Sequence, residues 1–172
     1  MIFFTAIGKI SQLIERSETM AIDVIDEKLL SVLQENARIS ISELSKRINL
    51  SLSAVSERLK KLEASGVIRQ YTAILDPIEM EKNVLGIVMV SVAGDPRLSD
   101  FIKFVNTSDS VMSCSRCTGA YDYIVKICAK NQSEFQDVLD SIKRIRGVSS
   151  LYSSVLLDDL KISYSVPPLA TK

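Results

Sequence analysis

The chain has no histidine and only three cysteines among its 172 residues. Histidine is the side chain that most often serves as a general base near neutral pH and as a zinc ligand, so its absence argues against histidine-based catalytic triads and most zinc centres. Three cysteines are also too few for a disulfide framework, which needs a denser and usually even set. We therefore expect a reduced, cytoplasmic protein that is not an enzyme and holds no metal or cofactor.

Net charge is absent as well, because 21 lysines and arginines balance 21 aspartates and glutamates. The whole molecule therefore offers no net attraction to a polyanion, and any nucleic-acid site must come from local clustering of bases. Hydrophobic residues make up 47% and charged residues 24%, which is typical of a folded globular chain. No apolar run approaches the length of a membrane span, and the N-terminus lacks the pattern of a signal peptide, so we expect no membrane partner.

The N-terminal part of the sequence divides into an extension and the start of a helical domain. Residues 1–20 are predicted to be an extension, and residues 2–16 within it carry apolar side chains at helical spacing. Asp23 is a plausible N-cap for the first helix of the next domain, which is predicted to end near Glu35. We expect this helical domain to cover residues 21–75.

Two further helices separated by a tight turn are predicted in the same domain. Ser40 and Glu43 fit a capping box that starts the second helix, and Asn49 ends it because asparagine tolerates the left-handed backbone conformation of a sharp turn. Ser51 then caps a third helix that ends before Gly66. The side chains predicted to face inward from these two helices are Ile41, Leu44, Ile48, Leu52, Val55, Leu59 and Leu62. The arrangement is a helix-turn-helix.

The outward side of the third helix carries hydroxyl side chains near its start and bases further along. Between Lys46 and Lys61 there are five bases and one acid. Such a helix can enter the major groove, where hydroxyls meet base edges and longer basic side chains reach phosphates, although a charged helix face is often only solvated. We expect Ser53, Ser56 and Glu57 to read bases. The complete set of predicted DNA-binding residues is Ser51, Ser53, Ala54, Ser56, Glu57, Arg58, Lys60, Lys61 and Arg69.

After the third helix, "VIRQYTAIL" at residues 67–75 is predicted to be a strand that forms the wing, and residues 76–83 are predicted to be a linker. The remaining chain, residues 84–172, shows strand and helix patterns in the order βαββαβ. Strands are predicted at 84–94, 111–117, 123–130 and 148–157, with helices after Asp95-Pro96 and around Phe135. Right-handed crossovers make this a four-stranded antiparallel sheet with both helices on one face, the ferredoxin-like plan.

Two short motifs in this second half are candidates for chemistry. "CSRC", residues 114–117, matches a metal or redox spacing, but residues three apart on a strand point to opposite faces, which favours ordinary packing. "TGAYD", residues 118–122, is consistent with a simple hairpin turn. The same motif also fits a binding loop, because glycine lets a ligand approach the backbone and Asp122 can accept hydrogen bonds from a cationic amine.

Taken together, "IDVIDEKLLSVLQENARISISELSKRINLSLSAVSERLKKLEASGVIRQYTAILDP" resembles the DNA-binding half of the Lrp/AsnC, or feast/famine, transcription factors. "TGAYDYIVKI" resembles part of their ligand-sensing half. The resemblance implies an α+β chain with a winged helix-turn-helix followed by a ferredoxin-like βαββαβ (RAM-type) domain. It also implies sheet-to-sheet dimers, rings that are commonly octamers, and an effector, usually an amino acid, bound between dimers. The effector-binding residues that it points to are Gly119, Ala120, Tyr121 and Asp122.

This sequence departs from the family pattern at Ser45 and Asn49, where alanine and glycine are usual, and in its N-terminal extension. We therefore expect a sequence-specific transcriptional regulator whose partners are double-stranded DNA, further copies of itself and an amino-acid effector. The alternative is a ligand-sensing oligomeric module without DNA binding. An enzyme such as an acyl-phosphate hydrolase is disfavoured, because the sequence shows no phosphate-binding loop and no paired catalytic acids.

Overall fold

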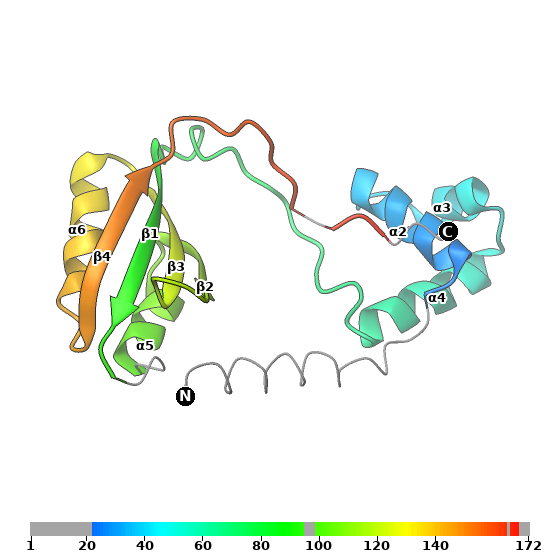
Figure 1. Cartoon of the computed structure of the whole chain (residues 1–172). Coiled ribbons are helices and arrows are strands. Elements are labelled where there is room, and N and C mark those ends of the chain that lie inside the picture. The colour runs from blue at the N-terminus through cyan, green and yellow to red at the C-terminus, as the bar shows by residue number, and fades with distance from the viewer. Residues whose placement is uncertain (1–21, 95–98, 165, 169–172) are drawn as a thin grey trace. The chain divides into compact units, whose positions relative to one another are not determined.

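The computed structural model describes residues 22–94, 99–164 and 166–168 (Figure 1). The helix predicted at residues 2–16 and the helix start predicted at residues 95–96 lie outside these ranges. Across the described residues, no helix is both long enough and apolar enough to cross a membrane.

The chain forms two compact units, described one at a time below. The helical unit contains the described residues up to Ala73 and those from Ser163 onward, and the sheet unit is Ile74–Ile162. The last residues thus group with the helices, whereas the sequence analysis assigned all of 84–172 to the second domain. A hydrogen bond of 2.6 Å from Gln34 Nε2 to the Val166 carbonyl holds this C-terminal segment on the helical unit.

The helical unit contains α2 (Val24–Glu35), α3 (Ile41–Ile48) and α4 (Leu52–Ala64). Each helix begins at the N-cap that the sequence predicted. Asp23 accepts the first backbone N–H groups of α2. Ser40 Oγ accepts from the Glu43 N–H at 3.1 Å, and Ser51 Oγ accepts from the Ala54 N–H at 3.2 Å. These side chains satisfy donors that have no partner within the helix, which explains why the helices start where they do.

The turn between α3 and α4 is built around Asn49, as predicted. Its φ of 57° and ψ of 50° place it in the left-handed region, where asparagine is tolerated. The Leu50 N–H donates to the Ser45 carbonyl at 3.1 Å, and the Ser45 hydroxyl donates back to the Leu50 carbonyl. The serine at position 45 therefore closes the turn.

The core of the helical unit contains one or two side chains from each helix. Leu29 of α2, Leu44 of α3, and Val55 and Leu62 of α4 are each at most 1% exposed and form a single cluster. These contacts press one side of α4 against the other two helices. The opposite side of α4 is left at the surface.

Two residues predicted to face inward are exposed instead. Ile41 is 44% exposed and Leu52 is 54% exposed. Each is the first residue of its helix, and helical side chains tilt toward the N-terminus, so a residue at the first position reaches beyond the packed turn. The inward assignment of Ile41 and Leu52 was therefore wrong.

The strand predicted at residues 67–75 is also wrong. Val67 and Ile68 pack against the helical core, but the residues that follow have no regular secondary structure, and Tyr71 and Ile74 are about half exposed. A strand is stable only where a neighbouring strand completes its hydrogen-bond ladder. The described part of the helical unit contains no such neighbour, so the β-rich composition yields an extended segment.

The sheet unit has the predicted βαββαβ order. Its elements are β1 (Val84–Val92), α5 (Ser99–Thr107), β2 (Val111–Arg116), β3 (Tyr123–Ala129), α6 (Gln132–Lys143) and β4 (Val148–Val155). The strands form one antiparallel sheet in the spatial order β2-β3-β1-β4. This is the predicted ferredoxin-like arrangement, and the chain as a whole has the predicted α+β class.

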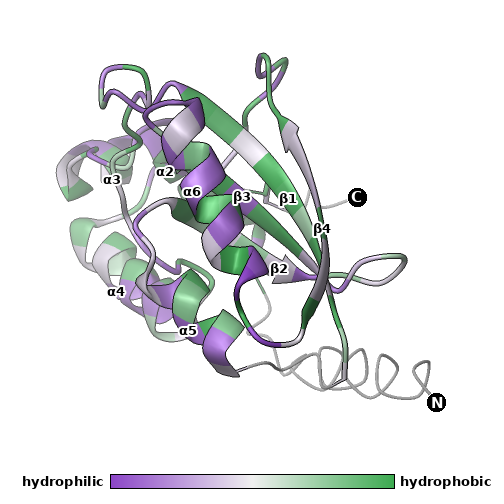
Figure 2. Ribbon diagram, turned by 90° about the vertical axis from the view of Figure 1, so that its left-hand side faces the viewer, coloured by the Kyte–Doolittle hydropathy of each residue, from purple (hydrophilic) through white to green (hydrophobic). Residues whose placement is uncertain are grey.

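Both helices of the sheet unit cover the same face of the sheet. Phe101 of α5 and Phe135 of α6 belong to one buried cluster with Val88 of β1 and Val125 of β3, which are opposite each other in the ladder. Figure 2 shows α6 lying in front of β1 and β3. Among the residues of this unit that the structure describes, no helix lies over the other face of the sheet.

An apolar row crosses that uncovered face. Met89 of β1 pairs with Ile124 of β3 on one side and with Tyr152 of β4 on the other. Ile124 is 39% exposed and Tyr152 is 54% exposed. Because adjacent apolar side chains are seldom left open over a broad sheet face, this row is suited to contact with another surface.

Gly86 provides a test of how α6 packs on the sheet. A Cβ at this position would overlap the Phe135 ring, so Gly86→Ala should destabilise the sheet unit by about 1–3 kcal/mol through overpacking. Urea unfolding followed by circular dichroism measures this loss. Combining Gly86→Ala with Phe135→Leu should cost less than the sum of the two changes, because the smaller side chain removes the overlap. Additive losses would contradict this packing.

Candidate nucleic-acid interface and effector hairpin

Helix α4 presents the serines predicted to meet DNA. Ser51 and Ser53 are exposed, and their hydroxyl oxygens lie 3.1 Å apart at the start of the helix. Ser56 is half-buried, and its hydroxyl donates to the Leu52 carbonyl at 2.9 Å. Ala54, between them, is half-buried. The leading end of α4 is therefore a small polar surface, with the exposed Leu52 side chain as its apolar component.

The exposed charged residues of α4 are Glu57, Lys60, Lys61 and Glu63. Glu57 and Lys61 form an ion pair of 3.0 Å between side chains that are 70% and 62% exposed. Exposed pairs of this kind contribute little stability and exchange readily, so Lys61 can turn to another anion at small cost. Lys60 has no carboxylate within ion-pair distance among the described residues.

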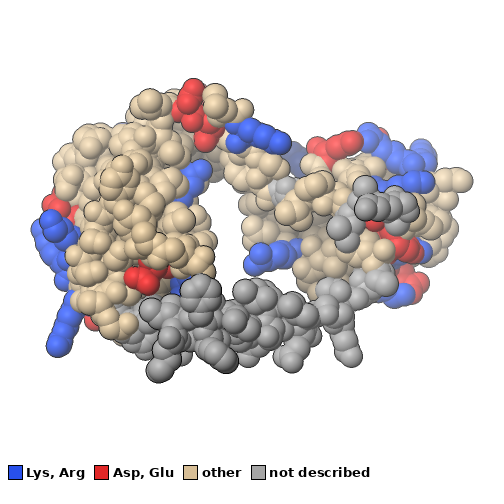
Figure 3. Space-filling view, in the orientation of Figure 1, with Lys and Arg blue, Asp and Glu red and all other residues tan. Residues whose placement is uncertain are grey.

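The other bases of the predicted patch also include one that is paired with carboxylates and others that are not. Arg47 lies 3.7 Å from both Glu35 and Glu43, whereas Lys46 and Arg69 have no acidic partner in the part of the chain that is described. Basic and acidic side chains are interspersed over the helical unit in Figure 3. The local excess of bases is therefore smaller than the sequence count indicated.

Arg69 lies in the extended segment after α4, and this segment is tied back to the helix. The Tyr71 hydroxyl donates to Glu63 Oε1 at 3.0 Å. Burial, together with this carboxylate, raises the pKa of Tyr71 to about 12, so the hydroxyl stays protonated and remains a donor. Arg69 is thus held near the C-terminal end of α4.

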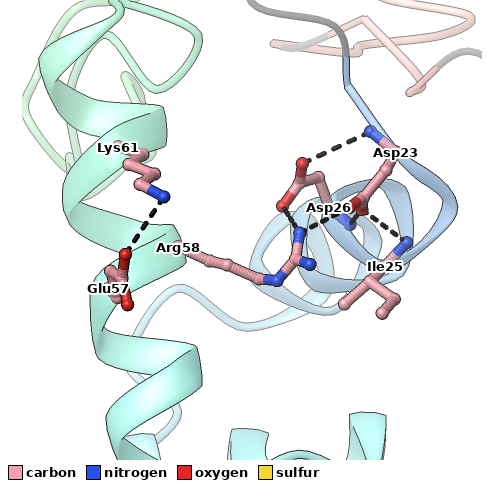
Figure 4. Close-up of polar contacts among 6 residues, drawn as sticks. All are labelled: Asp23, Ile25, Asp26, Glu57, Arg58 and Lys61. Atoms are coloured by element: carbon pink, nitrogen blue, oxygen red, sulfur yellow. Dashed lines mark hydrogen bonds and ion pairs between the residues drawn. The ribbon is translucent and has the colours of Figure 1, made fainter.

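Arg58 differs from the other bases because it points into the helical unit. Its Nη1 lies 2.7 Å from Asp23 Oδ2 and 2.8 Å from Asp26 Oδ1 (Figure 4). The Asp26 side chain is 8% exposed and the Arg58 side chain is 29% exposed. Hydrogen bonds to Asp26 and Asp23 raise the pKa of Arg58, so the guanidinium is firmly charged.

Sequence reasoning missed this role, although a signal was available. Arg58 comes three residues after Val55 and four before Leu62, and this spacing places it beside the buried stripe of α4. It was counted instead with the bases of the exposed side. The carboxylates that receive it, Asp23 and Asp26, stand at the start of a helix 32 or more residues earlier, where no local pattern links them to Arg58.

The predicted effector residues lie in the hairpin between β2 and β3. Gly119 has a φ of 117°, which only glycine adopts readily, and both Gly119 and Ala120 are exposed. Tyr121 and Asp122 are half-buried. The structure therefore brings the four residues together in one loop.

Asp122 also has a structural role that the sequence did not reveal. Its Oδ2 accepts from the Val92 N–H at 2.8 Å, and its own N–H donates to the Val90 carbonyl at 2.9 Å. The ladder between β1 and β3 ends at the pair of Val90 and Tyr123, so Asp122 supplies an acceptor where regular pairing stops. One carboxylate oxygen is thereby used, and the carboxylate is held in a fixed position.

The cysteines behave as packed thiols. Cys114 packs against the core of the sheet unit, and burial raises the pKa of both Cys114 and Cys128. Cys117 Sγ donates to the Tyr121 carbonyl at 3.2 Å. A raised pKa lowers the thiolate fraction that redox chemistry and metal binding need. Within the described residues, no three candidate ligands gather as a metal site.

A shallow cleft of about 360 Å³ between α5 and β2 was not anticipated from the sequence. Apolar side chains form most of its wall, and Arg116 and Asn106 provide its charged and polar groups. The other residues that line the cleft are Ile102, Val105, Val111, Met112, Ser113, Cys114 and Tyr123. The cleft belongs to the sheet unit alone.

Comparison with known proteins gives matches to both halves of the chain. A winged helix-turn-helix DNA-binding model matches residues 22–69, and a model of the Lrp/AsnC ligand binding domain matches residues 85–166. The chain is 31% identical over 146 residues to the HTH-type transcriptional regulator FL11 of Pyrococcus furiosus, with 85% of this chain and 96% of that protein covered. It is 32% identical over 150 residues to the leucine-responsive regulatory protein of Haemophilus influenzae, covering 86% and 90%.

Solved structures show the same similarity. A transcriptional regulator from Neisseria meningitidis, in complex with L-methionine, is 37% identical, with a TM-score of 0.80 over 86% of this chain and 97% of that one. A feast or famine regulatory protein from M. tuberculosis, also complexed with L-methionine, is 27% identical, with a TM-score of 0.78 over 86% and 100%.

The α2 cap should weaken in acid. The Asp26 N–H and the Arg58 guanidinium lower the pKa of Asp23 from its ordinary value of 3.8. A carboxyl whose pKa is lower in the folded chain stabilises it fully above the ordinary pKa, and this stability is lost as the pH falls through the folded value. Asp23→Asn keeps a capping oxygen without the charge, so its melting temperature should be below that of the wild type at neutral pH, and the difference should shrink as the pH falls through the lowered pKa of Asp23. A difference in melting temperature that does not change with pH would contradict this.

Proposed function

This chain belongs to the Lrp/AsnC family of transcriptional regulators, and on that premise we propose that it reads duplex DNA with α4, two copies acting together. The family that the sequence resembled is thus confirmed, and with it the role of a DNA-binding transcriptional regulator. The observation that carries the proposal is the one-sided burial of α4. Val55 and Leu62 are buried while the hydroxyls and bases on the opposite side are exposed.

Each part of α4 then has a role that suits its chemistry. Ser53, Ser56 and Glu57 approach base edges in the major groove, where hydroxyls and carboxylates find donors and acceptors. The exposed Leu52 side chain fits an apolar contact such as a thymine methyl group. The residues assigned to phosphates are Lys60, Lys61 and Arg69.

Two-fold pairing supplies the second recognition helix. The uncovered row formed by Ile124, Met89 and Tyr152 supports a sheet-to-sheet dimer, because a symmetric contact would bury it on both copies. Half-sites would then be separated by about one helical turn of roughly 10 base pairs, or by a multiple of it. Assembly of dimers into a larger ring such as an octamer follows the family pattern and is part of this proposal.

An amino acid is the proposed effector, bound at the hairpin of Gly119, Ala120, Tyr121 and Asp122. Two of the similar structures are complexes with L-methionine, which makes methionine the first ligand to test. The fixed Asp122 carboxylate supports this site, because a preorganised acceptor can receive a ligand ammonium group without further ordering. Binding between dimers would couple the effector to the assembly and so to the spacing of the DNA-binding units.

The alternative function is a ligand-sensing oligomer that does not bind DNA. Salt dependence separates the two, because phosphate contacts release counterions and make the affinity fall steeply as salt rises. We expect the protein to bind genomic fragments with such a dependence. A flat response would favour the alternative.

Lys60→Ala should weaken binding to all DNA sequences to a similar degree. One lost phosphate contact lowers the slope of log K against log salt by about 0.9 per site. Fluorescence anisotropy at several salt concentrations measures both quantities. Lys28→Ala is the matched control, because Lys28 is an exposed base on α2 rather than α4, and it should leave the slope unchanged. An equal slope for wild type and Lys60→Ala would mean that α4 is oriented differently.

Asp122→Asn should weaken methionine binding about tenfold or more while the fold is kept, because asparagine can still accept from the Val92 N–H but carries no charge. Isothermal titration calorimetry with L-methionine measures the change. Asp158→Asn, which removes an exposed charge elsewhere, should not alter the affinity. An unchanged affinity in Asp122→Asn, with a loss in Arg116→Gln, would move the ligand to the cleft beside α5.

A further inference from the structure

We propose that Arg58 is a positioning residue, which sets the orientation of α4 for DNA reading through Asp23 and Asp26 and makes no DNA contact of its own. This inference rests on the proposed function, since it assumes that α4 is the helix that reads DNA. It revises the assignment of Arg58 as a DNA-binding base and gives α2 a part in recognition.

The first observation that supports this proposal is that the two oxygens of each carboxylate accept from different partners. Asp23 uses Oδ1 to accept from the Ile25 and Asp26 N–H groups, at 2.9 and 2.8 Å, and Oδ2 to accept from Arg58. Asp26 uses Oδ2 to accept from the Asp23 N–H at 3.3 Å, and Oδ1 to accept from Arg58. Figure 4 shows the guanidinium facing both acids. Arg58 is therefore attached to the capping box of α2, whose own geometry is fixed by backbone hydrogen bonds.

The second observation is that the hydrogen bonds of Arg58 restrain the orientation of α4, which its apolar contacts do less well. Val55 and Leu62 hold α4 through apolar burial, which is non-directional and tolerates small rotations of a helix. Charge-assisted hydrogen bonds have a defined length and direction. The Arg58 bridge lies between these two buried residues in sequence and beside their stripe, so it opposes rotation of α4 about its axis.

The third support is the balance of charge. Arg58 contributes one positive charge against the two carboxylates, so the group as a whole does not attract phosphate. Moving the guanidinium to a phosphate would leave Asp26, only 8% exposed on its side chain, without its cation. A nearly buried carboxylate that loses its cation is strongly unfavourable. Arg58 therefore stays paired with the two carboxylates when DNA binds.

Asp26→Asn provides the sharpest test, because positioning and simple electrostatics predict opposite signs. Removing a negative charge near DNA should tighten binding if only the net charge matters. Loss of the bridge should instead weaken binding about tenfold, the size of losing one specific base contact. Glu35→Gln is the matched control, because it removes one exposed negative charge from the same helix without touching Arg58. It should bind DNA as tightly as the wild type or more tightly.

A double-mutant cycle then tests whether Arg58 acts through Asp26. Arg58→Met should weaken DNA binding with an unchanged salt slope, whereas Lys60→Ala lowers the slope by about 0.9. Arg58→Met combined with Asp26→Asn should bind no more weakly than Arg58→Met alone, because Arg58→Met already removes the hydrogen bond that Asp26→Asn breaks. A lowered slope in Arg58→Met, additive losses in the double variant, or tighter binding by Asp26→Asn would overturn the proposal.

Stability is measured on the same full-length proteins, so that unfolding is not mistaken for misorientation. Affinities are compared at a temperature at which circular dichroism shows every variant folded. If a single variant unfolds, the DNA affinity of the double variant is compared with that of the wild type instead. The double variant leaves no unpaired charge at position 26 or 58. Its binding should then be weaker than that of the wild type with an unchanged salt slope, and wild-type affinity would overturn the proposal. Wild-type protein that binds no duplex would refute the proposed function itself.

Discussion

The helical unit depends on four almost completely buried side chains at the point where its three short helices meet. They are Leu29, Leu44, Val55 and Leu62. Isolated helices of fewer than about 12–15 residues are marginal in water, and α3 has 8 residues and α4 has 13. Full burial of such a side chain is worth roughly 1.5–3 kcal/mol, so tertiary packing rather than intrinsic propensity keeps α3 helical. The same packing fixes which side of α4 is exposed, so the position of the residues predicted to face DNA depends on it.

Carboxylates connect local structure to distant parts of the chain in both units. Glu134 Oε2 accepts from the Lys130 N–H at 2.8 Å at the start of α6, while its Oε1 receives Lys82 at 3.0 Å and Ser110 at 3.4 Å. These bonds, that from the Lys130 N–H first, lower the pKa of Glu134. Asp23 and Asp26 share their oxygens in the same way between the start of α2 and Arg58. A helix start is thereby fixed relative to an element far away in sequence.

Features that depend on neighbours in sequence were predictable. Ser40, Ser51 and Asn49 act through backbone groups within five residues. The four-stranded sheet was also predictable, from its repeated strand-helix-strand pattern, but a single contact or strand that depends on a distant partner was not. The segment at residues 67–75 has the composition of a strand, but pairing decides whether a strand forms. Composition cannot supply the partner.

The candidate site likewise contains residues that could be placed from the sequence and residues that could not. The exposed side of α4 follows from the 3.6-residue period, so Ser53 and Lys60 could be placed on it from sequence. The roles of Arg58 and Asp122 depend on acceptors and donors that the fold brings from elsewhere, namely the start of α2 and the end of β1. The spacing of Arg58 from Val55 and Leu62 indicates that it lies beside the buried stripe of α4, but no local pattern identifies the partners of Arg58 or Asp122. Residue type therefore led to Arg58 being grouped with the bases predicted to face DNA.

The proposed phosphate contacts of one copy are few, which favours DNA binding by two copies. With Arg58 bridged to Asp23 and Asp26, the bases assigned to phosphates are Lys60, Lys61 and Arg69. Three phosphate contacts would give a salt slope of about 2.7 in magnitude, and the neutral chain adds no long-range attraction. A dimer doubles the contacts and makes the second unit's binding effectively intramolecular. Under the proposed function, affinity for DNA therefore depends on the assembly, and the proposed effector would act by changing that assembly.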